Sequence, residues 1–221
     1  MSEEKKWDRN TMIDRRNSFF PEDYAIGILM ELSSEHEFVK ISHPENGELW
    51  VSPKQARYIS KISNAEVFFK APRSSFSVTV MKEKFPPVID VRRMEDLLWE
   101  AALLASQGRL IDGLRKYDVV QFARWPNLTR APLTPNVMRI CALLSRFPSG
   151  IFLSQVILNV EEAEINSVCS AAQVIGIVKL LNRKFEIDSE EVAMAELKKQ
   201  TVIASNEGKF FARLFAKLSS L

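Results

Sequence analysis

Consecutive prolines divide this chain into two parts with different hydrophobic patterns. Pro86 and Pro87 favour extended backbone, and the sequence changes from strand-like to helical periodicity after Asp90. Glycine is scarce, with 7 among 221 residues, so prolines mark most of the breaks between elements. The sequence therefore predicts an α+β protein whose first domain ends at residue 88.

The part before the double proline alternates helical and strand-like segments. Helices are expected from Pro21 and over residues 52–60, where Ser52 and Pro53 have the residue types of a capped helix start. Segments rich in Val, Ile and Phe are expected to be strands, at residues 37–42, 48–52, 66–70 and 76–82. Between the first two lies Pro-Glu-Asn-Gly, which is typical of a hairpin turn. This order predicts a small α-ββ-α-ββ domain over residues 18–88, after a polar tail.

A long amphipathic helix is expected directly after the double proline. Its apolar side chains recur at helical spacing, and Gly108 supplies a C-terminal stop. These side chains are Met94, Leu97, Leu98, Ala101, Leu104 and Ala105. We predict that this helix packs between two domains, as a bridge within residues 89–134.

The rest of the bridging region is basic and contains one distinctive segment. Residues 124–130 are Arg-Trp-Pro-Asn-Leu-Thr-Arg, so Trp125 lies between the cations Arg124 and Arg130. An indole flanked by cations is typical of a surface that binds a ligand or a partner. The same indole also suits a plug between the domains, with both arginines left in water. Trp125→Ala distinguishes the two interpretations: it should unfold the protein if the indole is a plug and selectively weaken partner binding if it is a surface.

Three helices at close spacing are expected after Pro135, over residues 137–146, 151–158 and 162–175. A hairpin of residues 176–181 and 184–187 is expected to follow, which would complete a winged helix over residues 135–187. The segment resembles bacterial winged-helix modules at its apolar positions, namely Met138–Leu144, Leu153, Ile157, Val168, Ala172 and Ile175–Val178. With the preceding Trp-Pro segment, the arrangement also resembles bacterial proteins of unknown function. The resemblance implies a fold and carries no activity.

DNA binding is the alternative function that this resemblance suggests. A winged helix that binds DNA usually presents cations or amides along its recognition helix. The expected recognition helix instead begins with Glu161, Glu162 and Glu164, and no Arg or Lys lies between Arg146 and Lys179. In this alternative, phosphates would be contacted by Arg139, Arg146, Lys179, Arg183 and Lys184.

The last segment, residues 188–221, has the pattern of a charged tether followed by a basic amphipathic helix. The apolar face of that helix comprises Phe210, Phe211, Leu214, Phe215 and Leu218. Its border carries Lys209, Arg213 and Lys217. Three interpretations remain open: the helix folds back on its own domain, docks in a partner's groove or lies on an anionic membrane.

Signals for catalysis and for cofactors are weak. Cys141 and Cys169 lie in apolar helical patterns, which is typical of reduced core thiols. His36 and His43 have acidic neighbours near a strand, a pattern more typical of solvated surface than of a metal site. Neither the Gly-rich dinucleotide fingerprint nor the Gly-Lys-Ser/Thr phosphate loop occurs. We therefore expect no enzyme, no metal and no cofactor.

The sequence places the protein in the cytoplasm. Residues 1–16 mix both charges without the apolar core of a signal peptide, and no apolar stretch approaches the roughly 20 residues that cross a bilayer. We predict a regulatory or scaffolding adaptor that binds another protein. The alternatives are nucleic-acid binding by the winged-helix-like domain and peripheral membrane contact through the tail. Its partner-binding residues are expected to be Phe210, Phe211, Leu214, Phe215, Lys209, Arg213, Lys217, Arg124, Trp125 and Arg130.

Overall fold

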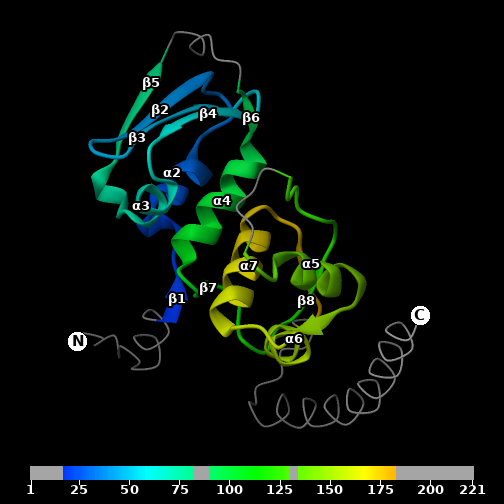
Figure 1. The fold of residues 1–221 in the computed structure, drawn as a ribbon. Helices are drawn as coiled ribbons and strands as arrows, with labels where there is room; N and C mark the ends of the chain where they lie inside the picture. Colours follow the sequence, from blue (N-terminus) through cyan, green and yellow to red (C-terminus); the bar gives the residue numbers. More distant parts are fainter. Residues whose placement is uncertain (1–16, 82–89, 130–133, 183–221) are drawn as a thin grey trace, which may run out of the picture. The chain divides into compact units, whose positions relative to one another are not determined.

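The computed structural model describes residues 17–81, 90–129 and 134–182 (Figure 1). The chain divides into two compact units, residues 1–181 and 182–221, and nearly all described residues belong to the first. That unit combines helices with mostly antiparallel strands, so the predicted α+β class is confirmed. None of its described helices is long and apolar enough to span a membrane. The predicted domain boundaries remain predictions.

A five-stranded sheet in the order β5-β2-β3-β4-β6 forms one layer of this unit. Its strands are β2 (Phe38–His43), β3 (Gly47–Ser52), β4 (Arg57–Ile62), β5 (Ser77–Met81) and β6 (Arg92–Arg93). The predicted first hairpin is confirmed, because β2 and β3 pair antiparallel with Val39 opposite Val51. Gly47 closes its turn at φ +106°, where a Cβ would lie 2.1 Å from the carbonyl oxygen of Lys61. Only glycine fits there.

The helix predicted over residues 52–60 is wrong. The amide N–H of Ala56 donates to the carbonyl oxygen of Pro53 in a tight turn, and β4 begins at Arg57. Ser52 and Pro53 suit a turn as well as a helix start, and Ala56 adopts a left-handed φ of 51° that reverses the chain. Tyr58 and Ile59 are buried in the sheet, and this tertiary burial outweighs the local helix signal.

The strand predicted over residues 66–70 is also wrong, because this segment forms α3 (Ala65–Lys70). Asn64 caps the helix, its side-chain oxygen accepting a hydrogen bond from the amide N–H of Val67 at 3.1 Å. Phe68 and Phe69 are buried side by side, a packing that α3 provides without strand pairing. β5 consequently pairs with β2 instead of with residues 66–70.

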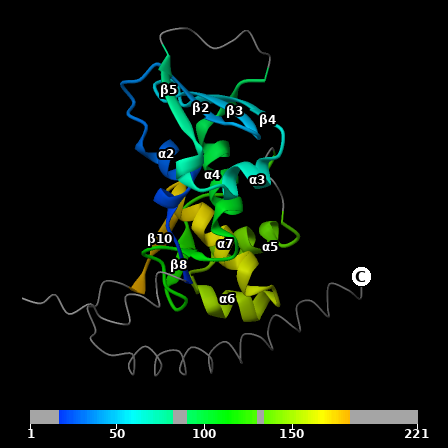
Figure 2. The ribbon, with the colours of Figure 1, turned by 90° about the vertical axis from the view of Figure 1, so that its left-hand side faces the viewer.

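Helices cover one face of the five-stranded sheet, as Figures 1 and 2 show. The covered face presents buried Val39, Ile41, Leu49, Val51 and Tyr58. Over it lie α2 (Ala25–Glu31), the short helices η1 (Pro21–Asp23) and η2 (Arg73–Ser75), α3, and α4 (Met94–Ser106). The long helix predicted after the double proline is therefore confirmed as α4.

Helix α4 contacts α2 and α3 on one side and α7 (Glu162–Val174) on another. It ends where Gln107 and Gly108 both take left-handed backbone conformations, as predicted for Gly108. A Cβ on Gly108 would lie 2.7 Å from the Cβ of Ala163, so glycine permits close approach of α7. Helix α4 thus packs against apolar residues on two sides, those of α2 and α3 and those of α7, which explains its broad apolar surface.

The remaining elements pack around α7. β1 (Ser18–Phe19) pairs parallel with β7 (Leu110–Ile111), and a three-stranded sheet has the order β10-β8-β9. The strands of this sheet are β8 (Val119–Phe122), β9 (Ser149–Gly150) and β10 (Val178–Leu180). The three predicted helices are confirmed as α5 (Val137–Arg146), α6 (Ile151–Leu158) and α7.

Strand β10 has a partner that the sequence did not predict. It pairs antiparallel with β8, which precedes all three helices in the chain, with Lys179 opposite Gln121. The expected second strand of the hairpin, residues 184–187, lies outside the described residues. The predicted winged helix did not include β8, which precedes the three helices and is the middle strand of this sheet. The resemblance therefore stays a prediction.

Candidate protein-binding surface

Helix α7 uses its polar side chains inside the protein. The hydroxyl of Ser170 accepts from the amide of Ile111 at 2.8 Å, and the hydroxyl of Ser167 accepts from the amide of Gly108 at 3.1 Å. The amide of Asn166 donates to the carbonyl oxygen of Gly108 at 3.0 Å. Ser167 and Ser170 are buried at 8% and 0% exposure. These side chains, expected on a recognition helix, therefore fasten α7 to the connection between α4 and β7.

Helix α6 shows the opposite arrangement, with large apolar side chains exposed to solvent. Its inward side carries Ile151 and Ser154, which are 1% and 0% exposed. Its outward side is mostly apolar: Val156 is 60% and Ile157 52% exposed, while Phe152, Leu153 and the polar Gln155 are partly exposed. We call the apolar residues of this side the α6 patch: Phe152, Leu153, Val156 and Ile157. Ile157, expected in the core from the winged-helix resemblance, is thus corrected to the surface.

Both ends of α6 are held in place by hydrogen bonds. At its start, the amide N–H groups of Ile151 and Phe152 donate to the carbonyl oxygens of Asp118 and Lys116, at 3.1 and 3.0 Å. At its end, the guanidinium of Arg139 donates to the carbonyl oxygen of Leu158 at 2.7 Å. The α6 patch is therefore presented on an anchored helix.

Aromatic side chains extend the patch at the start of α6. The ring of Tyr117 lies 5.9 Å from that of Phe152, and Tyr117 is 49% exposed. Phe147, in the connection between α5 and α6, is 51% exposed. Lys116 places its Nζ 5.0 Å from the Phe152 ring centroid and also pairs with Glu162 at 2.9 Å. Apolar exposure thus continues beyond α6 itself.

The Trp-Pro segment is tied to the beginning of α4. Arg124 donates to the carboxylate of Glu95 at 2.7 Å, and the amide of Asn127 donates to Asp96 at 3.1 Å. Trp125 is 47% exposed, so about half of its indole is open to a ligand or partner. Because Glu95 neutralises Arg124, the described part of this predicted surface offers one half-exposed indole.

The remaining predicted partner-binding residues lie outside the described residues. They are Arg130, Lys209, Phe210, Phe211, Arg213, Leu214, Phe215 and Lys217. Their role as a binding surface therefore stays a prediction.

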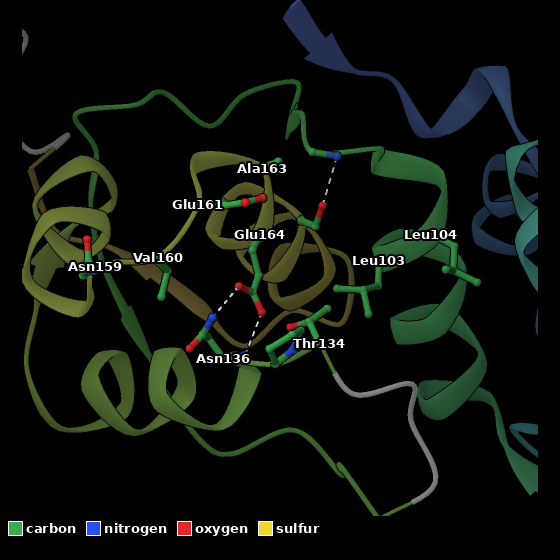
Figure 3. Close-up of a pocket in the computed structure, with 12 residues that line it drawn as sticks. Leu103, Leu104, Thr134, Asn136, Asn159, Val160, Glu161, Ala163 and Glu164 are labelled. Atoms are coloured by element: carbon green, nitrogen blue, oxygen red, sulfur yellow. Dashed lines mark hydrogen bonds between the residues drawn. The ribbon is translucent and has the colours of Figure 1, made fainter.

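A groove of about 630 Å³ lies between the end of α4 and the beginning of α7 (Figure 3). Leu103 and Leu104 line one side, and Glu164 on α7 faces Asn136, which donates to it through both its backbone and side-chain nitrogen at 2.7 Å. Partial burial alone would raise the pKa of Glu164, but the hydrogen bonds from Asn136 outweigh it and lower the pKa. This carboxylate is therefore occupied in holding the start of α5.

The cysteines lie in the core as predicted, whereas His36 and His43 are half-buried and not on solvated surface. Cys141 and Cys169 are free and fully buried, as predicted for core thiols, and burial raises the pKa of Cys141 to about 12. His43 stacks edge-on against Phe76, with its Nδ1 3.1 Å from the side-chain nitrogen of Asn46. Among residues 17–81, 90–129 and 134–182, no three His, Cys, Asp or Glu side chains gather as a metal site.

The surface that sequence analysis missed is the α6 patch. One signal was available: residues 151–158 contain no charged side chain, although helices at a protein surface usually carry several. Periodicity alone assigned these residues to a core, because it does not say which apolar face receives a partner. No protein family, curated protein or solved structure matches this chain, so its function is inferred from geometry alone.

Proposed function

We propose that this chain is a non-enzymatic regulatory or scaffolding protein that binds another protein, and that the α6 patch is its main contact surface. One observation carries the proposal. The outward side of α6 presents four apolar side chains beside the single polar residue Gln155, with Val156 and Ile157 more than half exposed. Contiguous apolar surface of this kind is characteristic of interaction sites.

Binding at this patch is energetically reasonable. Fully burying a Val, Leu, Ile or Phe side chain contributes about 1.5–3 kcal/mol, so a few such residues suffice for a hot spot. The helix is already ordered by the bonds to Asp118, Lys116 and Arg139, so binding loses little additional conformational entropy there. A partner's helix or groove that covers α6 would meet a preformed surface.

The DNA-binding alternative has weaker support. Ser167 and Ser170 are buried in bonds to the α4–β7 connection, so the expected recognition helix has few polar side chains left for bases. Arg139 and Arg146 are exposed on α5 and would contact phosphates together with Lys179, while Arg183 and Lys184 lie outside the described residues. That alternative predicts binding to duplex DNA that falls steeply with salt.

A matched pair of valines tests the proposal. Val156 on α6 is 60% exposed and Val80 on β5 is 58% exposed, so each accepts a carboxylate with similar effect on folding. The full chain, Val156→Asp and Val80→Asp would each be used to retain proteins from native cells, with quantitative mass spectrometry. We expect Val156→Asp to lose a specific partner at least tenfold (about 1.4 kcal/mol) while Val80→Asp keeps it.

Circular dichroism and thermal melts of both variants provide the folding control. A partner that both valine variants retain equally would overturn the proposal that α6 is the contact surface. Retention of nuclease-sensitive nucleic acid, with no protein that depends on Val156, would favour the DNA-binding alternative.

A further inference from the structure

The stretch of residues 119–160, which contains α6, carries charge of one sign. Residues 119–160 contain no Asp or Glu, but they contain Arg124, Arg130, Arg139 and Arg146. Arg115 adds a cation four residues before this stretch. This imbalance stands out in a chain whose 30 basic and 28 acidic residues nearly cancel.

Two of these cations lie near the start of α6. Arg115 is exposed and precedes Lys116, whose carbonyl oxygen accepts the amide of Phe152. Arg146 is exposed and immediately precedes Phe147, in the short connection from α5 to α6. Neither guanidinium has an ion pair with another residue in the part of the chain that the structure describes. Lys116, by contrast, is neutralised by Glu162.

We infer that the α6 patch binds an acidic amphipathic segment of a partner protein. Apolar side chains of that segment would lie over Phe152, Val156 and Ile157, and its carboxylates would meet Arg115 and Arg146 at the start of α6. Charge complementarity of this kind selects a partner and speeds its association. The inference rests on the proposed function and adds the chemical class of the partner.

The same charges disfavour two other occupants, the basic segment of residues 209–217 and a second copy, while the chain's own acidic residues 186–197 are an outcome that the experiment distinguishes. The chain's own amphipathic segment carries Lys209, Arg213 and Lys217 along its border and would bring cations toward Arg115 and Arg146. A second copy packed on α6 would add the same two arginines to the interface and no acidic residue from residues 119–160. An acidic segment removes the imbalance, whereas either alternative increases it.

Site-specific photocrosslinking in native cells tests the inference. p-Benzoylphenylalanine would replace Val156 in the full chain, with the same residue in place of Val80 as a control on an equally exposed strand. The crosslinked peptide would be identified by mass spectrometry. We expect a segment of another protein with apolar residues at helical spacing and Asp or Glu on its border.

Charge variants supply the second arm of the experiment. In the Val156-labelled chain, Arg115→Glu with Arg146→Glu should reduce crosslinking about tenfold, because attraction becomes repulsion. Arg115→Lys with Arg146→Lys should retain most of it, and Arg57→Glu on β4 should leave it unchanged. Circular dichroism of each variant separates loss of binding from loss of fold.

Each outcome is decisive. A crosslinked segment without acidic residues, or crosslinking that charge reversal leaves unchanged, overturns this inference and leaves the proposed function standing. Crosslinks to residues 186–197 or 209–217 of the same chain, or to a second copy, also overturn it. No protein crosslink from Val156 above the Val80 control contradicts both the inference and the proposed function.

Discussion

Helices α6 and α7 are neighbours in the chain and differ in the way their residue types are used. The eight residues of α6 include six large apolar side chains, yet Val156 and Ile157 on its outward side are more than half exposed. Helix α7 begins with glutamates and contains serines and an asparagine, yet residues 167–172 are all buried. From composition alone, α6 would be expected to be the more buried helix, but α7 is.

The difference follows from what lies on each side. Helix α7 is placed between α4, β7 and the other two helices, so most of its circumference is covered. Its small residues permit close approach, and its hydroxyl groups satisfy backbone groups of the α4–β7 connection. Helix α6 is covered on one side only. A helix's environment is thus decided by its neighbours as much as by its own pattern.

The largest expected difference between the two helices is in thiol reactivity. Val156→Cys should react with a thiol reagent such as DTNB rapidly, while Cys141 and Cys169 react about a thousandfold more slowly. Burial both shields the native thiols and raises the pKa of each. Absorbance at pH 8 follows the reaction, and a denaturant control should release all three thiols. Comparable rates for native and introduced thiols would contradict a closed α5–α7 interior.

Two isoleucines compare the helices by stability. Ile165 on α7 is 0% exposed and Ile157 on α6 is 52% exposed. Ile165→Ala should lower the free energy of unfolding by about 2–5 kcal/mol, because it leaves a cavity. Ile157→Ala should cost less than about 1 kcal/mol. Urea unfolding of both variants measures the difference, and equal losses would mean that α6 is covered in solution.

Buried serines provide a finer comparison. Ser170→Ala on α7 leaves the amide of Ile111 without its acceptor and should cost about 1–3 kcal/mol. Ser154→Ala on α6 removes a bond to the carbonyl oxygen of Gly150, at 2.9 Å. That carbonyl still accepts the first intrahelical bond, so the cost should stay below about 1 kcal/mol. The same unfolding assay separates them, and a larger loss for Ser154→Ala would refute this ranking.

The smallest expected effect concerns pH. Helix α6 has no titratable side chain, whereas Glu164 on α7 has a pKa held below its usual 4.5 by hydrogen bonds. Its carboxylate therefore stabilises the fold above that pH, and the contribution is lost as pH falls through the lowered pKa. Glu164→Gln should reduce stability at pH 7 by about 1 kcal/mol or less. The difference from wild type should shrink in acid; a constant difference would contradict this role.

Local signals explain which elements were predicted correctly. The hairpin of β2 and β3 has a Pro-Glu-Asn-Gly turn, and α4, α5, α6 and α7 have clear periodicity between proline or glycine breaks. The predictions for residues 52–60 and 66–70 were wrong because each short segment is compatible with two kinds of secondary structure. Ser52–Pro53 suits a turn or a helix, and Val-Phe-Phe suits a strand or a helix. Burial of Tyr58 in the sheet and the cap at Asn64 decided these cases.

The candidate site was less predictable than the fold. Trp125 was predicted as part of a surface, and its 47% exposure is compatible with that interpretation. The α6 patch escaped prediction because Leu153 and Ile157 have the spacing of core residues. A periodic pattern identifies an apolar side but does not specify what covers it.

The sequence by itself determined the α+β class, the positions of the long helices, the first hairpin and the two buried thiols, because each depends on residues close in the chain or on strong periodicity. Only the tertiary structure decided that β8 pairs with β10, that the serines of α7 are buried and that Val156 and Ile157 of α6 are exposed to solvent. These outcomes depend on which distant segments meet. Hydrophobic burial drives that assembly without direction, so no local pattern specifies the result.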